Sequence, residues 1–373
     1  MDTNFLLVVL LLVLGFLLPF LIFVMRNLSN ILPYLYAIAR IRAKEARLLK
    51  PETLDEMINT GSVAEIASIL ENTEYALAMQ GLVLDSAESI EDLLVRQTAD
   101  VYSEIAKMLP DKVKSGFSFL SHQWDVRNLK VILRGVRKGL SAEQIAARLV
   151  SFGEMEMDLL KKMAESGSVE DVISLFEGTR YSEVAGLAGA YEQEPTLLPL
   201  EALLDRLLLE QMWFFVTSDA ELAVLRPAFA ARIDALNLKT MLRAKRDHLL
   251  YSDIEKYLIA GGELQDRLAG SFDEVDEIGA LLVELEGTPY YKSLMDMLSE
   301  YEKTGSLFQL EKVLEETALA IGRDTAVKQP YGIAPMAGYL SLKDIEIKNI
   351  RAIVRAKEAG MAPEKIREFV LRV

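Results

Sequence analysis

The hydrophobic pattern of the chain changes once, near residue 30. From Phe5 to Met25, 21 residues carry no charge, enough for a helix to cross a hydrocarbon core of about 30 Å. Beyond residue 33 charged residues are interspersed with apolar ones, helix formers dominate, and runs of alternating Val, Ile and Thr are absent. The pattern predicts an N-terminal transmembrane helix followed by an all-α body.

The uncharged segment could also be a cleaved signal peptide. A signal peptide has a positive stretch before a shorter apolar region and a small-residue cleavage site after it. Here Asp2 precedes the run, and Arg26 and Asn27 follow it, so a retained anchor is favoured. Six basic residues between Arg26 and Lys50 stand against the single acidic Glu45. This bias predicts a cell-membrane protein with its body on the cytoplasmic side and its N-terminus outside.

Two further segments are informative. Residues Leu197–Val216 are rich in leucine, but they contain four charged residues at helical spacing: Glu201, Asp205, Arg206 and Glu210. This pattern predicts a buried amphipathic helix with a polar stripe facing water, and it argues against a second membrane span. Residues Lys328–Tyr339 contain two prolines and two glycines, and we expect an extended loop there before the last long helix.

Two phrases alternate along the body, and each occurs three times. The first, Glu-x-Thr-x-Tyr, ends at Tyr75, Tyr181 and Tyr290. The second, Asn-Leu/Ile-Lys/Arg-x-x-aliphatic-Arg, occupies Asn128–Arg134, Asn237–Arg243 and Asn349–Arg355. Each phrase recurs after 106 to 112 residues. A fixed long period predicts one large helical unit used three times.

The three units are permuted, because the third asparagine phrase reaches the C-terminus before any Thr-Tyr phrase follows it. The missing half lies at the start of the body, where Arg42 leads to Thr73. We therefore expect residues 36–76 to pair with 340–373, next to units at about 77–183 and 184–294. Residues 1–30 would form the anchor and linker, and 31–373 a funnel of three pseudo-symmetric helical bundles, since an open solenoid would need polar caps.

Composition excludes several classes of function. Net charge is −15, which argues against a nucleic-acid partner. The absence of cysteine and the presence of two histidines leave no thiolate or imidazole cage for a metal. Neither a phosphate-binding nor a dinucleotide-binding glycine loop occurs. We therefore predict no catalytic residues, no cofactor, no metal and no small-molecule substrate, and an enzyme is the least favoured class.

The recurrent residues have both structural and functional interpretations. The tyrosine rings are expected to be buried with their hydroxyls paired, and the threonines to bond a nearby carbonyl or cap the turn. Acid, amide and two bases share one helix face in the asparagine phrase, and can fasten neighbouring helices or grip an acidic partner. The candidates are Asn128, Lys130, Arg134, Asn237, Lys239, Arg243, Asn349, Arg351 and Arg355. His122 and His248 have no partner pattern and are expected at the surface or satisfied.

These phrases resemble a known family. Residues 36–44, the Glu-x-Thr-x-Tyr phrases, 125–130, 234–239 and 343–351 are similar to the C subunit of A/V-type rotary ATPases. Its eukaryotic relative is the d subunit of the vacuolar ATPase. The resemblance runs from about Tyr34 to Val373, and it rests on the order and spacing of the motifs more than on any single one.

The resemblance implies a non-catalytic rotor subunit of an H+- or Na+-translocating ATPase or ATP synthase. Such a protein couples the membrane rotor ring to the central axle and transmits torque, so ring and axle subunits are the expected partners. The anchor departs from the family pattern, and a helix on a rotating part would fit only inside the ring. A membrane-anchored helical scaffold that recruits cytoplasmic proteins is the alternative.

Overall fold

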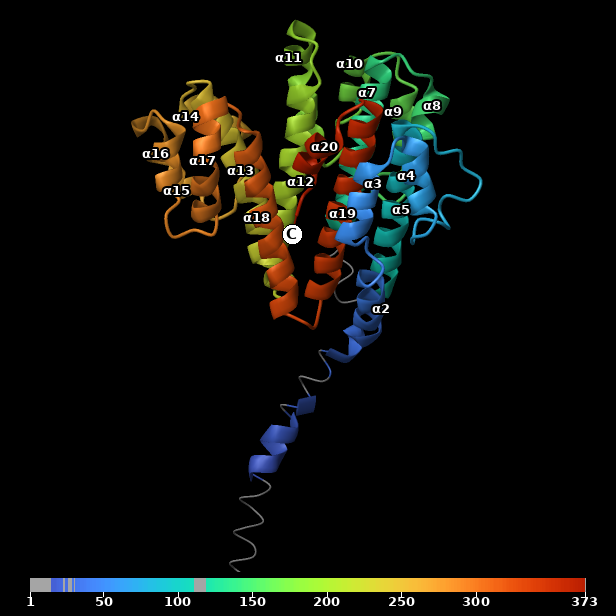
Figure 1. The fold of residues 1–373 in the computed structure, drawn as a ribbon, viewed down its shortest axis with the longest axis vertical. Helices are drawn as coiled ribbons and strands as arrows, with labels where there is room; N and C mark the ends of the chain where they lie inside the picture. Colours follow the sequence, from blue (N-terminus) through green and yellow to red (C-terminus); the bar gives the residue numbers. More distant parts are fainter. Residues whose placement is uncertain (1–14, 23, 26–28, 30, 111–118, 373) are drawn as a thin grey trace, which may run out of the picture.

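The computed structural model describes residues 15–22, 24–25, 29, 31–110 and 119–372. This part of the chain contains helices and no strand, which confirms the predicted all-α class. Six long helices carry the fold: α5 (Ala87–Met108), α7 (Phe119–Arg137), α12 (Leu198–Ser218), α13 (Arg226–Arg246), α18 (Phe308–Lys328) and α19 (Ala334–Glu358). They lie close together at the lower end of Figure 1 and diverge upward.

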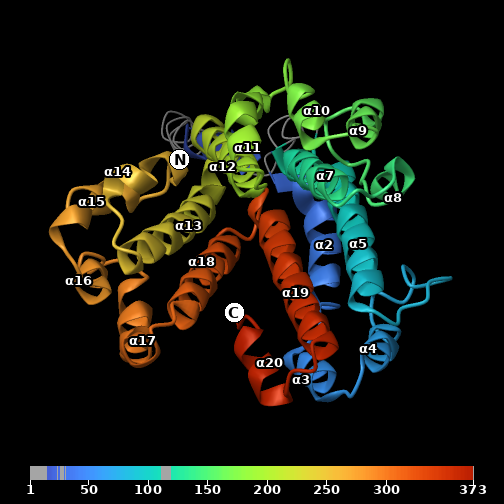
Figure 2. The same ribbon diagram turned by 90° about the horizontal axis from the view of Figure 1, so that it is seen from above.

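The six long helices contact one another in cyclic order. α5 packs on α19, α19 on α18, α18 on α13, α13 on α12, and α12 on α7. Edge-to-face packing of Tyr102 on α5 against Trp124 on α7, with ring centroids 5.7 Å apart, completes the circuit. Figure 2 shows these helices around a common centre, with most of the shorter helices toward the periphery. In the orientation of Figure 1, the chain runs downward through the descending helices α5, α12 and α18. They alternate along the sequence with the ascending helices α7, α13 and α19, in which the chain runs upward.

Shorter helices connect the long ones at the upper end and along the sides. They are α2 (Leu35–Glu45), α3 (Pro51–Asn59), α4 (Val63–Leu70), α8 (Ala142–Ala146), α9 (Met157–Ala164), α10 (Val169–Ser174), α11 (Ala188–Gln193), α14 (Tyr251–Ile254), α15 (Gln265–Ala269), α16 (Ile278–Val283), α17 (Tyr291–Thr304) and α20 (Pro363–Phe369). Short 3₁₀ turns lie at Leu32–Tyr34, Ser182–Leu187, Ala223–Leu225, Glu255–Tyr257 and Phe272–Glu274.

Local sequence explains many of the helix ends. The side-chain oxygens of Ser62, Ser141 and Ser168 accept the third backbone N–H of α4, α8 and α10, the arrangement expected of N-cap residues. Proline lies in the first turn of α3, α12, α13, α19 and α20, where its missing N–H costs no helical hydrogen bond. Gly305 adopts φ +67° directly after α17, a conformation that ends a helix at little cost for glycine.

The extended loop expected over 328–339 is wrong for half of its length. α18 continues to Lys328 and α19 already begins at Ala334, so the connection is short. Pro335 fits because it lies in the first turn of α19. Gly338 fits because α18 approaches closely: a Cβ at this position would lie 2.3 Å from the Cβ of Ala326. Here glycine serves close helix packing and does not interrupt the helix.

Three buried clusters form the core. One contains residues of α13, α16, α17 and α18, and the largest combines α5, α7 and α12 with the first turns of α19. The remaining cluster joins side chains between Met57 and Leu94 to side chains between Ile347 and Val370. Both ends of the body therefore bury their apolar residues together.

The predicted membrane span lies largely beyond what the structure describes. Residues 5–14 and 23 of the segment Phe5–Met25 are outside the described residues, whereas 15–22 are helical and exposed (blue, Figure 1). Within the described ranges, no helix combines the length and apolar character needed to cross a bilayer. The second stretch weighed as a span, Leu197–Val216, forms most of α12 and buries Leu200, Leu204 and Leu208, as predicted.

Candidate functional site

The three motif asparagines make the same contact. Each is buried on an ascending long helix, and its amide pairs with both backbone groups of the residue 22 positions later. Nδ2 donates to the carbonyl oxygen at 2.7 to 3.1 Å and Oδ1 accepts the N–H at 2.8 to 3.0 Å. The pairs are Asn128–Val150, Asn237–Ile259 and Asn349–Leu371. An amide that satisfies a whole peptide fixes the register between helix and following segment.

An acidic residue three positions before each asparagine makes a second contact. Asp125 accepts the N–H groups of Glu154 and Met155 at 3.1 and 3.0 Å. Asp234 accepts those of Glu263 and Leu264 at 2.8 and 3.1 Å.

At the third position the acid bonds the start of the body instead. Glu346 accepts the N–H of Leu49 and, at 2.7 Å, the hydroxyl of Tyr75. Burial and the charge of Glu346 raise the pKa of Tyr75 well above its usual value, so this hydroxyl remains a donor. The contact links residues 271 positions apart.

The motif tyrosines are buried and their hydroxyls are paired, as predicted. Tyr181 donates to the carbonyl of His122 at 3.4 Å, and Tyr290 to that of Ala231 at 3.0 Å. Thr73 and Thr179 bond the carbonyl three residues earlier at 2.6 and 2.7 Å, whereas Thr288 has a buried hydroxyl with no partner among the described residues. The threonine prediction is therefore confirmed twice and wrong once.

The motif bases lie opposite carboxylates on the neighbouring descending helix. Lys130 and Arg134 on α7 reach Asp205 and Glu201 on α12, and the arginine contact is bidentate at 2.6 and 2.7 Å. Glu201 and Asp205 therefore do more than face water, which corrects part of the expectation for this stripe. Such partly exposed pairs contribute about 0–1 kcal/mol each, so they align helices more than they stabilise them.

The other two ascending helices repeat these pairs. Lys239 and Arg243 on α13 reach Glu315 and Glu311 on α18. Burial acts to raise the pKa of Glu315, but Lys348 and Lys239 outweigh it and lower the value to about 2. On α19, Arg351 bonds Glu91 of α5 at 2.6 Å, and Arg355 lies 3.6 Å from the same carboxylate. The structure thus brings each motif base to an acid of its own chain.

Two of the three sites contain a basic side chain close to the acid. Lys343, fully buried, contacts Glu74, Glu346 and the hydroxyl of Tyr75, the last two at 2.5 and 2.9 Å. His122 is buried and contacts Arg180 and Glu154. Burial lowers the pKa of His122, and its Nδ1 has no partner among the described residues. The expectation of a surface or fully satisfied histidine is wrong here, because the ring fills the core.

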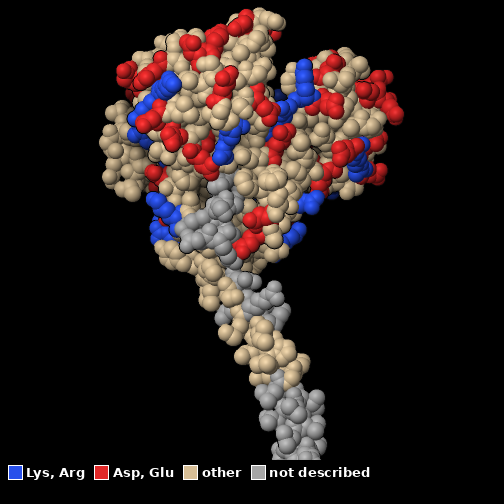
Figure 3. Space-filling view, turned by 180° about the vertical axis from the view of Figure 1, so that it is seen from behind, with Lys and Arg blue, Asp and Glu red and all other residues tan. Residues whose placement is uncertain are grey.

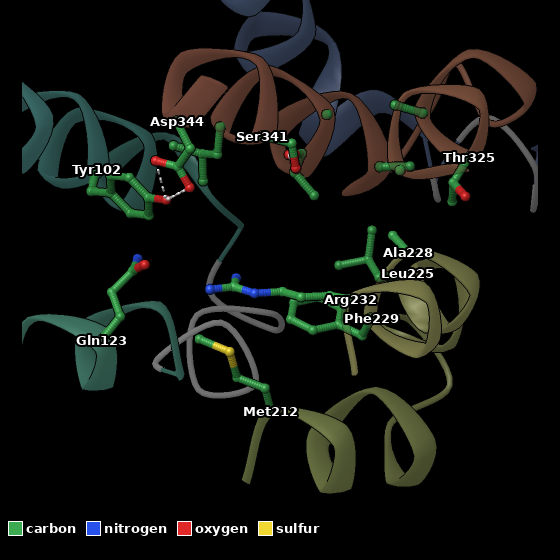
Figure 4. A pocket seen from close by; sticks show the side chains of 16 residues that line it. Tyr102, Gln123, Met212, Leu225, Ala228, Phe229, Arg232, Thr325, Ser341 and Asp344 are labelled. Carbon is green, nitrogen blue, oxygen red and sulfur yellow. Dashed lines mark hydrogen bonds between the residues drawn. The ribbon is translucent and has the colours of Figure 1, made fainter. Parts of the chain in front are cut away.

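A cavity of about 80 Å³ lies where the long helices converge. Its walls are mostly small and apolar, and Figure 4 shows the guanidinium of Arg232 extended toward Gln123 and the Tyr102–Asp344 pair. The Tyr102 hydroxyl lies 3.2 and 3.3 Å from the two Asp344 oxygens. Burial raises the pKa of Asp344. Within the described ranges, no group of three His, Cys, Asp or Glu side chains is arranged to hold a metal.

Comparison with known proteins decides the family. The ATP synthase (C/AC39) subunit family matches residues 37–369. The chain belongs to this family. It is 32% identical over 355 residues to the A-type ATP synthase C subunit of Methanocaldococcus jannaschii, covering 94% of this chain and 89% of that protein. The Methanothermobacter thermautotrophicus C subunit is 34% identical over 352 residues, covering 92% and 89%.

The motifs of this C/AC39 chain contain the basic residues of each helix contact but not their carboxylate partners. Sequence reasoning missed the carboxylate partners Glu91, Glu201 and Glu311, and it missed Lys343 as a buried cation. A usable signal existed for two of them, because Glu201 follows Arg134 by 67 residues and Glu311 follows Arg243 by 68. No comparable spacing points to Glu91, which lies 260 residues before Arg351.

Proposed function

We propose that this C/AC39 chain is a non-catalytic central-stalk subunit of an A/V-type rotary ATPase or ATP synthase. It joins the membrane rotor ring to the central axle and transmits torque between them. Relatives of this chain are named as the C subunit of an A-type ATP synthase. The observation that carries the mechanical part is the cyclic contact of the six long helices, with Leu49 and Tyr75 joined to Glu346.

Cyclic contact matters because torque twists a part about its axis. In an open row of helices the end members slide with little resistance, whereas in a circuit every helix is held on both sides. Native packing density resists such sliding further. We therefore propose a funnel of three units, closed by the pairing of residues 36–76 with 340–373, that turns as one stiff body.

The motif residues serve this stiffness. Each asparagine locks the segment that follows its helix, and each pair of bases aligns the neighbouring helix, so we assign the nine candidates to helix fastening. Their carboxylate partners lie within the chain, which argues against a basic rim that grips an acidic partner.

Docking to the ring is proposed for the lower end in Figure 1. Exposed apolar side chains gather on the elements found there, namely Leu32, Leu35, Tyr36, Phe214, Val327 and Tyr331. The acidic residues instead crowd the upper part seen in Figure 3, where a notch separates two lobes. We propose that the ring contacts the apolar end and that the axle enters between the lobes.

Copurification tests the proposal. A tagged full-length chain is captured from gently solubilised native membranes, and the bound proteins are identified by mass spectrometry. We expect ring and axle subunits in one complex, visible as a rotary assembly by electron microscopy. Capture of other proteins without ring and axle would instead support a membrane-anchored scaffold.

The segment Phe5–Met25 is proposed as a helix in the lumen of the rotor ring. A part that turns with the ring cannot carry a helix outside it without striking the stator. Because the chain has no cysteine, a single cysteine at position 10 or 14 gives a clean crosslinking probe. We expect crosslinks to the inner helices of the ring, and crosslinks to stator helices would refute the placement. A chain truncated to residues 34–373 should fold but wash off the membrane more easily.

A further inference from the structure

The three equivalent sites differ at two positions. The residue three before the acid is His122 on α7, Lys343 on α19 and Ala231 on α13. The residue between the motif threonine and tyrosine is Arg180 in the first case, Glu74 in the second and Pro289 in the third. Two sites therefore contain a cation from the chain itself, and the α13 site has neither a cation nor a long side chain at these positions.

An open cleft occupies the corresponding place beside α13. It measures about 860 Å³ and lies against the first half of α13, the last turns of α18 and the segments around Leu264 and Pro289. The first turns of α13 and the last turns of α18 are the parts nearest the lower end in Figure 1. Part of the cleft wall is therefore formed by the helix ends that we place next to the ring.

The polar groups of this cleft are incompletely paired. Asp234 is 3% exposed, and both of its backbone hydrogen bonds go to Oδ1. No cationic side chain of the described residues pairs with it, and the buried hydroxyl of Thr288, which also lines the cleft, has no partner there. A buried carboxylate without a counter-charge is costly in free energy, and an ion pair or proton must offset that cost.

We propose that this cleft binds a lysine or arginine side chain of a neighbouring subunit, in the place that Lys343 and Arg180 fill from within the chain. The cation would lie against Asp234, and the free hydroxyl of Thr288 would accept one of its N–H groups. This inference rests on the proposed function for the identity of the neighbour. The chemistry of the cleft does not depend on it.

The charges around the cleft favour a cation, although they are mixed. Glu263 and Asp324 line it together with Arg267 and Lys328. Arg267 donates to the carbonyl of Glu286, so its head is engaged, and Lys328 is exposed at the end of α18. Burial is the main cause that raises the pKa of Asp234, to about 6, and the charge of Glu263 adds to it. A bound cation would instead lower the pKa of Asp234.

Three variants of the full chain test the inference in the assembled complex. Ala231→Lys places an ammonium in the cleft from within, as Lys343 does at the α19 site, and Asp234→Asn removes the counter-charge while keeping the side chain's shape. Ala147→Lys adds the same charge on an exposed turn directly after α8, outside the cleft and away from the lower end. We expect the first two to weaken binding to the remaining subunits about tenfold or more, and the third to leave it unchanged.

A direct titration tests the chemistry without the complex. Alanine methyl groups are labelled with 13C, and n-butylammonium or methylguanidinium is added at pH 8 to wild-type and variant chains. We expect a saturable shift at Ala231 in the wild type, none in Asp234→Asn, and none with butyrate. Circular dichroism melts show that each variant is folded.

The outcomes separate the inference from the proposed function. Absence of a saturable shift at Ala231 would overturn the cation site, even if the wild-type chain copurifies with ring and axle. Amine binding combined with normal assembly of both cleft variants would overturn the subunit side chain as occupant. Failure of the wild type to copurify with a ring and axle would refute the proposed function, while the titration still decides the chemistry of the cleft.

Discussion

The sites on α13 and α19 share the asparagine contact, but their acidic residues obtain hydrogen-bond partners from very different distances along the chain. On α13 the partners of Asn237 and Asp234 come 22 to 30 residues later. On α19, Asn349 also finds its partner 22 residues later, but Glu346 bonds groups 271 and 297 residues earlier. The comparison shows that a site of this kind is built from segments that lie together in space, even where they are far apart along the chain.

The α19 site also contains the ionic cluster that the α13 site lacks. Lys343, Glu74, Tyr75 and Glu346 bring two distant segments of sequence into one buried network. A site that must hold non-adjacent segments gains most from such contacts, because no short connection keeps the partners close. The α13 site has its segments tethered and tolerates an open cleft.

Loss of the cation from the α19 site should have the largest effect. Lys343→Met leaves Glu74 and Glu346 buried without their counter-charge, and we expect the free energy of unfolding to fall by about 3–5 kcal/mol. Urea denaturation followed by circular dichroism measures the change. Lys365→Met, which breaks the exposed Lys365–Glu368 pair, is the control and should cost less than about 1 kcal/mol. Similar small losses for both variants would contradict the importance of the cluster.

Because the α13 site has no cation among the described residues, we predict that the contribution of Asp234 to the free energy of unfolding falls as the pH rises. An ion-paired carboxylate such as Glu315 shows the opposite trend. Because the pKa of Asp234 is raised to about 6, its stabilising contribution is present below about pH 4 and is lost as the pH rises through 6. We expect Asp234→Asn to gain roughly 2–3 kcal/mol relative to wild type between pH 4 and pH 8. Urea denaturation at a series of pH values measures this difference.

Glu315 provides the matched contrast for that measurement. Its pKa is lowered to about 2 despite burial, so its contribution is present above about pH 4.5 and is lost only as the pH falls through 2. Glu315→Gln should therefore lose stability relative to wild type throughout the range from pH 5 to 8. A difference between Asp234→Asn and wild type that does not change with pH would show that Asp234 titrates normally.

The asparagine contacts should give the smallest difference between the sites. Asn237→Ala leaves the buried peptide groups of Ile259 without partners, and we expect a loss of about 2 kcal/mol. Asn349→Ala should cost about half as much, because its hydrogen bonds to Leu371 are only partly buried, whereas those between Asn237 and Ile259 are buried. Equal losses in urea denaturation would mean that the C-terminal segment is held as firmly as the segment around Ile259.

Much of the fold could be predicted because helical composition and recurring phrases are local properties of the sequence. The burial of the motif tyrosines followed from their chemistry. The helix start at Ala334 was missed because proline and glycine usually interrupt helices. Here Pro335 lies in the first turn of α19, and Gly338 allows close packing on Ala326.

The candidate sites were less predictable, because each depends on residues distant in sequence. Nothing local distinguishes Lys343 from an exposed lysine, since its burial depends on Glu74 and Tyr75, about 270 residues earlier. Likewise, the significance of Ala231 emerges only when its position is compared with those of His122 and Lys343. Alanine is informative at position 231 only because the equivalent positions on α7 and α19 have large basic side chains.

The bond between Tyr75 and Glu346 imposes an order on biosynthesis. Tyr75 leaves the ribosome 271 residues before its partner, a delay of roughly 15–50 s at 5–20 residues per second. During that time the segment from Met57 to Leu94 has no surface from α19 on which to bury its apolar side chains. The N-terminal part of the body is therefore synthesised first but completes its packing last. Until then its apolar side chains are exposed, and chaperones can bind them.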